Sequence, residues 1–412
     1  MRAYVRSLDP QLSRDVWLLQ LGGLTNAFGN GIVLPFLIIY LHNVRGLSLG
    51  LAGLAAAVNS AAALLSGFLA GSLADRIGPQ RVLIGSLVGM AAAISLFPLI
   101  HDVWSAYTLQ LFMGSCSGAF WPSQSAMLTA LAPTGRRHNA FAVQRLTMNL
   151  GVALGGFTGG AVARVEHPRT FTVLFLLDAC TFLSYAAVAL FLPSPRHAGP
   201  ERGTYTEVLR DRPFMRYVVV NTLFITAGMV VVVELLAPYA KNDAGVDEKL
   251  IGILWMINSL VVVLAQLPVA KLAEGHRRMQ ALAVMGVIWA TAMLTVGAAG
   301  TWFSATGAFA LMALAVAVFA IGECLHGIVH GPLTADLAPN RLVGRYMAFG
   351  SQSWQVGWII GPAVGGFVLQ HAPNALWPGA AALNLAAVGF ALALERHLPQ
   401  AVLRAPSAHL AA

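Results

Sequence analysis

The 412-residue chain is 57% hydrophobic and only 10% charged, and its mean hydropathy is +0.71. Because soluble domains carry about 25% charged residues, this composition excludes an ordinary soluble globular protein. The net charge of +8 does not imply a nucleic-acid partner, since positive residues in loops beside anionic lipid account for it.

Long stretches with few charges follow one another, each about as long as the roughly 20 apolar residues that cross a bilayer as a helix. In chain order we expect transmembrane helices at residues 17–41, 49–72, 82–100, 104–131, 140–163, 171–192, 214–240, 249–273, 280–300, 302–333, 345–369 and 375–394. Nothing alternates in the manner of barrel strands, and the first span is too long for the apolar part of a signal peptide. The prediction is an all-α integral membrane protein with twelve transmembrane helices and no cleaved leader.

Lysine and arginine gather on one side of these spans. Of the 25 such residues, nineteen lie before the first span or near the C-terminal ends of the even-numbered spans. Five lie on the other side, and Arg145 lies within a span. Positive residues favour the cytoplasmic side of a membrane. We therefore expect a multi-pass protein of the plasma (cytoplasmic) membrane with both termini in the cytoplasm.

The chain divides into two similar halves. The longest polar stretch, residues 193–213, contains several prolines and mixed charges, which indicates a linker. The sequence NLGVALGGFTGG at 149–160 matches QVGWIIGPAVGG at 355–366, so that four glycines align at an offset of half the chain length. Such repeats are typical of transporters whose site lies between the halves at mid-membrane. The predicted domains are a six-helix bundle at 1–192, a cytoplasmic linker at 193–213 and a second six-helix bundle at 214–412.

The segment Gly71-Ser-Leu-Ala-Asp75-Arg76-Ile-Gly78-Pro-Gln-Arg81 follows the second span. Glycine permits a tight reversal, and the Asp75 carboxylate can accept from backbone N–H groups at a helix N-terminus. An ordinary positively charged turn is the alternative interpretation. The segment resembles the loop signature of the major facilitator superfamily, whose transporters consist of two pseudo-symmetric six-helix bundles. The resemblance implies that Gly71, Asp75, Arg76, Gly78 and Arg81 form a conformational latch that steadies the outward-facing state.

The glycines at 151–160 resemble the fifth-helix signature of the family's antiporters, except that Gly156 stands where a proline is expected. The proline occurs in the other half, as Pro362. Small residues at this spacing let helix backbones approach closely. Antiport and plain helix packing both remain open interpretations of this ladder.

Several ionisable residues fall inside the predicted spans, where they are costly and usually functional. The candidates for proton coupling are Glu323, Glu234, His326, Asp178 and Arg145. Glu323, His326 and His330 are spaced so that they share one helix face. A carboxyl group in a medium of low dielectric constant favours its neutral form, so it can take up and release protons. Asp178 could equally serve helix packing.

Two short patterns resemble the lactococcal multidrug–proton antiporter LmrP and its relatives within this superfamily. They are Ile321-Gly322-Glu323 with Asp336 beyond it, and Glu234-Leu-Leu-Ala-Pro238. The resemblance implies that Glu323 and Glu234 couple protons and recognise cations. This chain departs from that group at Gln144, where an acidic residue is expected, and Arg145 follows it.

Polar and aromatic residues on the spans expected around a central cavity suit an amphipathic ligand. The candidates for substrate binding are Asn26, Asn30, Trp121, Gln124, Asn149, Asn258, Trp354, Gln355 and Trp358. Two histidines and a carboxylate on one face could bind a metal, but structural or proton-relay use is the preferred interpretation, and no metal or cofactor is expected. The three cysteines lie inside spans and indicate no disulfide or zinc framework.

The sequence thus predicts a proton-coupled antiporter that works by alternating access and exports lipophilic or amphipathic compounds, as in multidrug efflux. Its expected partners are a small lipophilic or cationic substrate, protons and membrane lipid, and the expected state is a monomer. A lipid flippase or a proton-coupled importer of a small solute is the alternative in the same fold. A non-transporting receptor or scaffold is the alternative from another class. An enzyme is not expected, because no G-x4-G-K-[ST] loop or nucleophile–base pattern occurs.

Overall fold

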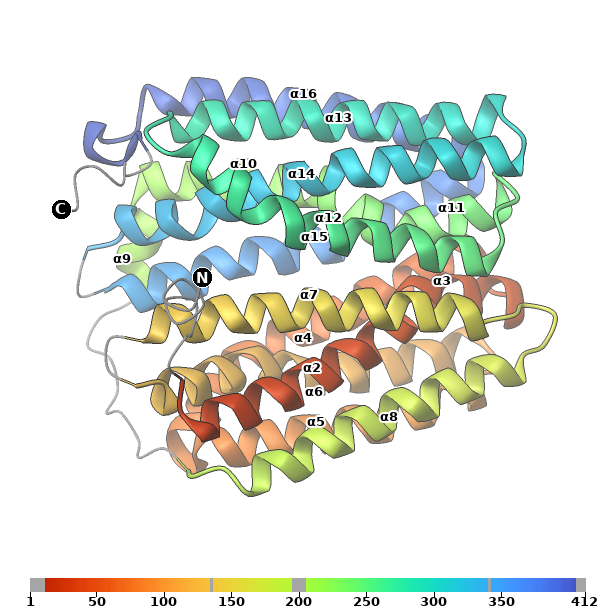
Figure 1. Ribbon diagram of the computed structural model, residues 1–412, viewed down its shortest axis with the longest axis horizontal. Coiled ribbons are helices and arrows are strands. Elements are labelled where there is room, and N and C mark those ends of the chain that lie inside the picture. The colour runs from red at the N-terminus through yellow and green to blue at the C-terminus, as the bar shows by residue number, and fades with distance from the viewer. Residues whose placement is uncertain (1–11, 134–135, 195–204, 340–341, 405–412) are drawn as a thin grey trace, which may run out of the picture.

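The computed structural model describes residues 12–133, 136–194, 205–339 and 342–404, which form long helices joined by short turns (Figure 1). The first group contains α2 (Arg14–Val33) with η1 (Leu34–Phe36), α3 (Leu37–Ile39) and η2 (Tyr40–Val44), then α4 (Leu49–Ile77), α5 (Pro79–Ser95) with η3 (Phe97–Leu99), α6 (Val103–Leu131), α7 (Arg137–Val162) and α8 (Arg169–Leu190). Successive segments run in opposite directions. We call the end of the molecule where α2 begins the α9 end, after the short helix α9 (Tyr205–Arg210), and the opposite end the α3 end.

The second group follows the short helix α9 (Tyr205–Arg210). It contains α10 (Arg212–Phe224) with η4 (Ile225–Leu235) and α11 (Leu236–Asn242), then α12 (Glu248–Ala273), α13 (Arg278–Trp302), α14 (Ala305–Leu337), α15 (Val343–His371), α16 (Pro373–Glu395) and η6 (Gln400–Val402). Residues 195–204, which make up much of the predicted linker, lie outside the described residues, whereas α9 and the start of α10 occupy its end.

Local sequence signals mark the residues at which these helices begin and end. The Ser48 and Asp211 side chains cap α4 and α10 by accepting from backbone N–H groups of the first turn, which satisfies donors that have no partner within the helix. Asp102 and Ser105 form a reciprocal capping box on α6. Gly78, at a φ of 93°, ends α4, and Pro79 begins α5 directly after it.

Among the described residues, nine helical segments are long and apolar enough to cross a membrane. The more polar helices α6, α7 and α15 contain 29, 26 and 29 residues, which at about 1.5 Å per residue also suffices for a bilayer. The predicted all-α architecture is therefore confirmed, and these twelve segments are consistent with the twelve predicted spans.

Most predicted boundaries differ from the structure by a few residues, and two of the differences concern the turns between helices. The tenth span was expected to begin at residue 302, but Trp302 ends α13 and α14 begins at Ala305, after a turn at Phe303 and Ser304. The segment 71–81 was expected to be a loop. Instead, α4 continues to Ile77 because nothing before Gly78 interrupts the helix, so the reversal itself consists of a single glycine.

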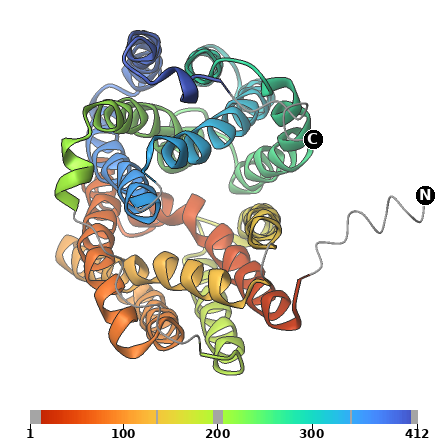
Figure 2. The same cartoon turned by 90° about the vertical axis from the view of Figure 1, so that its left-hand side faces the viewer.

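The two groups of helices lie side by side in both views (Figures 1 and 2). Within the first group α2 packs on α7 and α8, and α4 packs on α6; within the second α13 packs on α14 and α16, and α15 packs on η4. The main contacts between the groups are those of α4 with α15 and of α7 with α12.

Glycines let the groups meet closely towards the α3 end. A Cβ added at Gly53 of α4 would lie 2.2 Å from the Pro362 carbonyl oxygen of α15, and one added at Gly252 of α12 would lie 2.5 Å from the Gly156 carbonyl oxygen of α7. Side-chain carbons do not approach oxygens to these distances, so only glycine permits this backbone separation.

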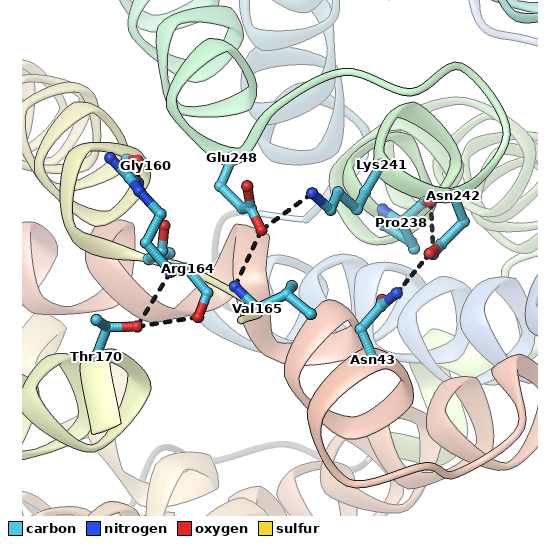
Figure 3. A network of polar contacts seen from close by, with 10 residues as sticks. Asn43, Gly160, Arg164, Val165, Thr170, Pro238, Lys241, Asn242 and Glu248 are labelled. Carbon is cyan, nitrogen blue, oxygen red and sulfur yellow. Dashed lines mark hydrogen bonds and ion pairs between the residues drawn. The ribbon is translucent and has the colours of Figure 1, made fainter. Parts of the chain in front are cut away.

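Polar contacts also join the two groups at the α3 end, and together with the glycine contacts we call them the closure at the α3 end (Figure 3). The Val165 backbone N–H, just beyond α7, donates to Glu248 Oε1 over 3.1 Å, and Lys241 Nζ lies 3.2 Å from the same oxygen. Asn43 Nδ2 donates to Asn242 Oδ1 over 2.6 Å. Because Val165 and Asn43 belong to the first group and the other three residues to the second, these bonds join the groups at the α3 end.

The glycine ladder of α7 has two faces. Gly151, Gly155 and Gly159 contact α2 within the first group, whereas Gly156 and Gly160 contact α12 of the second. One face therefore packs inside its own group, and the other face forms part of the boundary between the groups.

The ladder of α15 repeats this division. Gly357, Gly361 and Gly365 contact η4 within the second group, whereas the backbone at Pro362 and Gly366 contacts α4 of the first. The aligned glycines of the internal repeat thus occupy equivalent positions in the packing of both groups.

Candidate functional site: a cavity between the two groups

A cavity of about 160 Å³ lies between the two groups, near the middle of the helices. The first group contributes Leu34, Asn149 and Val152, and the second contributes side chains from η4, α11, α12, α14 and α15. Most of the lining is apolar. Its polar and indole side chains are those of Asn149, Trp255, Asn258, Ser259, Glu323 and Trp358. Pockets for drug-sized ligands measure about 300–1,000 Å³, so the helices must separate to admit such a ligand.

Glu323 is the one ionisable residue among the described residues that line the cavity. Asn258 Nδ2, on α12, donates a 2.7 Å hydrogen bond to Glu323 Oε2, on α14. An amide can hydrogen-bond a carboxyl group in either protonation state, and it brings no charge of its own. The contact therefore orients Glu323 without preventing its carboxyl group from binding or releasing a proton.

Arg145 reaches across from the first group to the second. A Cβ added at Gly327 of α14 would lie 2.4 Å from Arg145 Nη2 and 2.6 Å from Nη1, so the guanidinium rests against this glycine. Gly327 is one helical turn from Glu323, and Arg145 lies within Coulombic reach of the Glu323 carboxyl group. Among the described residues no carboxylate forms an ion pair with Arg145.

The two histidines of α14 contact α10 and not the Glu323 side chain. His326 Nε2 lies 2.7 Å from Asn221 Oδ1, and His330 Nδ1 lies 2.9 Å from the Tyr217 hydroxyl. Their rings stack with centroids 5.2 Å apart. Both histidines therefore belong to a polar cluster within the second group. No set of three or more His, Cys, Asp and Glu residues suited to a metal occurs in the described part of the chain.

Glu234 is only 6% exposed, and its Oε2 atom has no hydrogen-bond partner among the described residues. It lies near the end of η4, a stretch of π-helix that spans 11 residues; segments of this kind are frequent at functional sites. Its neighbours Val232, Val233 and Leu236 line the cavity, whereas Glu234 itself does not.

Asp178 lies apart from the cavity, between α8 and α2. Its side chain contacts Gly29, where an added Cβ would come within 2.2 Å of Oδ1. The Thr181 hydroxyl lies 3.2 Å from the same oxygen. These contacts favour the packing interpretation of Asp178 over a role in proton coupling.

The remaining predicted binding residues are dispersed. Trp358, Asn149 and Asn258 line the cavity, and Trp354 meets the rings of His326 and His330 edge-on. Gln124 donates to the Tyr185 hydroxyl inside the first group. Asn26 is buried, and its Oδ1 atom has no hydrogen-bond partner within the described ranges. Trp121 is half-exposed, and Asn30 and Gln355 are half-buried.

Comparison with known proteins decides the family. The family model described as Major Facilitator Superfamily matches residues 19–247 and 220–409. This chain belongs to the Major Facilitator Superfamily. It is therefore a multi-pass membrane protein from a family of transporters.

Its relatives are distant but cover most of the chain. The "Uncharacterized MFS-type transporter YttB" of Bacillus subtilis is 28% identical over 374 residues, which are 87% of this chain and 89% of the relative. The "Multidrug resistance protein MdtH" of Escherichia coli is 25% identical over 355 residues, 84% of this chain and 85% of the relative.

Solved transporters share the fold. A POT family transporter in complex with a thioalcohol-conjugated peptide superposes with a TM-score of 0.79 at 15% identity, covering 93% of this chain and 96% of its own. The nucleoside transporter NupG superposes with a TM-score of 0.76 at 12% identity, covering 92% of this chain and all of its own. At these identities the likeness establishes the fold alone.

The superfamily's loop signature lies at the α9 end, where α4 meets α5. Gly71, Asp75 and Arg76 fall on the last turns of α4, and Arg81 falls on the first turn of α5. The Arg76 and Arg81 side chains are exposed, and the side chain of Asp75 lies outside the described part of the structure. The latch role stays a prediction for this superfamily member.

Sequence reasoning missed several residues of the site. Trp255 and Phe319 line the cavity, and Tyr217 and Asn221 hold the two histidines. Trp255 precedes Asn258 by three residues, so helical periodicity could have placed it on the same face. Tyr217 and Asn221 offered no such signal, because their partners lie more than 100 residues away in the chain.

Proposed function

We propose that the chain is a proton-coupled antiporter that exports lipophilic or amphipathic compounds by alternating access, and not an enzyme. The observation that carries the proposal is the Glu323 carboxyl group, which lies in a mostly apolar cavity between the two groups and is held by the neutral side chain of Asn258. A carboxyl group at this position can exchange a proton for a solute in the same cavity. The multidrug resistance protein MdtH among its relatives supports this choice of substrate class.

In this proposal, the α9 end faces the cytoplasm, since the positive residues gather there, and the bundles 1–192 and 214–412 rock about the cavity. The closure at the α3 end then shuts the cavity towards the outside. A proton that enters from outside neutralises Glu323, and Glu234 serves as a second acid. The solute leaves before the carrier returns to the inward-facing form. The latch of Gly71, Asp75, Arg76, Gly78 and Arg81 steadies the opposite, outward-facing form.

The test is dye movement in proteoliposomes under an imposed pH gradient. Two dyes with closely similar xanthene cores serve as probes: rhodamine 6G, a monocation, and rhodamine B, a zwitterion. We expect gradient-dependent movement of at least one dye, abolished by a protonophore and absent from protein-free liposomes. If neither dye moves while the reconstituted protein is intact, the antiport proposal fails, and labelled phospholipids would then test the flippase alternative.

The contact of Glu248 with Val165 yields a prediction about closure. Glu248→Ala removes the carboxylate that accepts the hydrogen bond of the Val165 backbone N–H (Figure 3). A hydrogen bond to a charged group contributes about 1.5–3 kcal/mol, so we expect the form open at the α3 end to become at least about tenfold more populated. Distances between spin labels at positions 167 and 247, in a variant without its three cysteines, report this population.

Glu166→Gln is the matched control, since Glu166 is exposed at the same end. It is expected to leave the spin-label distances unchanged. Unaltered distances in Glu248→Ala as well would show that the hydrogen bond does not contribute to closure.

A further inference from the structure

The guanidinium of Arg145 has a defined position but forms no hydrogen bond or ion pair with the part of the chain that the structure describes. It rests on Gly327, where the absence of a Cβ leaves it room. No hydrogen bond or ion pair occupies its nitrogen atoms among the described contacts, although the side chain is exposed and so accessible to solute. An arginine has five N–H donors in a planar fork that matches a carboxylate. Here those donors are available to a ligand.

Arg145 also lies on the approach to the cavity. Asn149 lines the cavity, and Arg145 precedes it by one helical turn on α7. Glu323 lines the cavity, and Gly327 follows it by one turn on α14. Both offsets point towards the α9 end, so a solute that enters from that end passes the guanidinium before it reaches Glu323.

The charges around this point do not attract a monocation. When Glu323 is ionised, its charge and that of Arg145 cancel; when Glu323 is protonated, the positive charge of Arg145 remains alone. A monocation is therefore not attracted when Glu323 is ionised, and it is repelled when Glu323 is protonated. A solute with an anionic group can instead form a charge-assisted, bidentate contact with the guanidinium.

We propose that Arg145 selects amphipathic solutes that carry a carboxylate or similar planar anionic group and disfavours lipophilic monocations. This inference rests on the proposed function of the cavity as the transport site, and it narrows the substrate class. Arg145 acts as a specificity-determining residue: its fork binds the anionic group while the apolar lining receives the body of the solute.

Dye binding to purified protein in detergent tests the proposal, with fluorescence anisotropy corrected for protein-free micelles. Rhodamine B carries a free carboxylate, and rhodamine 6G carries an ester in its place. We expect the wild-type protein to bind rhodamine B about tenfold more tightly than rhodamine 6G. Arg145→Met is expected to remove this preference by weakening rhodamine B binding.

Two further variants separate charge from position. Arg145→Lys keeps the charge without the fork, and Gly327→Ala keeps the arginine but displaces its guanidinium, because the added Cβ would lie 2.4 Å from Nη2. Both are expected to lose part of the preference. Arg169→Met removes an exposed positive charge from the α3 end and is expected to bind both dyes as the wild type does.

A wild-type preference for rhodamine 6G, or an unchanged ratio of affinities in Arg145→Met, would overturn the inference. Binding in detergent needs no proton gradient. The preference can therefore be present even if gradient-driven transport is not found, and that combination would reject the antiport proposal while retaining the role of Arg145.

Discussion

Replacing Glu323 by glutamine is expected to reduce pH-driven dye movement to the level of protein-free liposomes. Glutamine has nearly the same shape, and its side-chain oxygen can still accept the hydrogen bond of Asn258 Nδ2, so the packing of α12 on α14 should persist. The variant lacks only the group that gains and loses a proton. The expected result is a folded protein that binds dye but does not couple binding to the gradient.

The measurement compares initial rates in proteoliposomes with dye binding and elution profiles of the same preparations. Glu166→Gln, in which the replaced carboxyl group is exposed at the α3 end, is the matched control and should transport normally. Glu234→Gln is measured in the same way as the variant of the second proposed acid, because Glu234 is buried beside the lining of the cavity but not within it. Full driven transport in Glu323→Gln would show that the carboxyl group in the cavity is not the coupling group.

Gly53→Ala is expected to abolish transport by preventing closure at the α3 end. The new Cβ would lie 2.2 Å from the Pro362 carbonyl oxygen, and a backbone oxygen cannot move aside as the tip of a flexible side chain can. α4 and α15 must then separate, which leaves the cavity unable to shut on that side. Alanine is the better helix former by about 1 kcal/mol, so a weakened helix cannot explain the loss.

Spin-label distances at the α3 end and dye transport should change together in this variant. Gly389→Ala is the control, since a Cβ at Gly389 of α16 meets no atom within 4 Å, and it should match the wild type in both measurements. If Gly53→Ala transports dye at the wild-type rate, the close approach of α4 and α15 is not required for the transport cycle.

The sequence by itself determined the membrane class, the approximate spans and the internal repeat. These features depend on hydropathy and on residues near one another in the chain, and a run of apolar residues must become a helix because no water satisfies its backbone inside a membrane. The sequence also identified Glu323, Asn258, Asn149 and Trp358, all of which line the cavity.

Only the tertiary structure decided which of these residues meet. Asn258 and Glu323 are 65 residues apart, and Arg145 and Gly327 come from different groups, so their contacts depend on how each helix is rotated and packed. The packing also decides which neighbour each glycine of α7 contacts, because adjacent positions on one helix point to different sides and the sequence of one helix does not show what lies opposite.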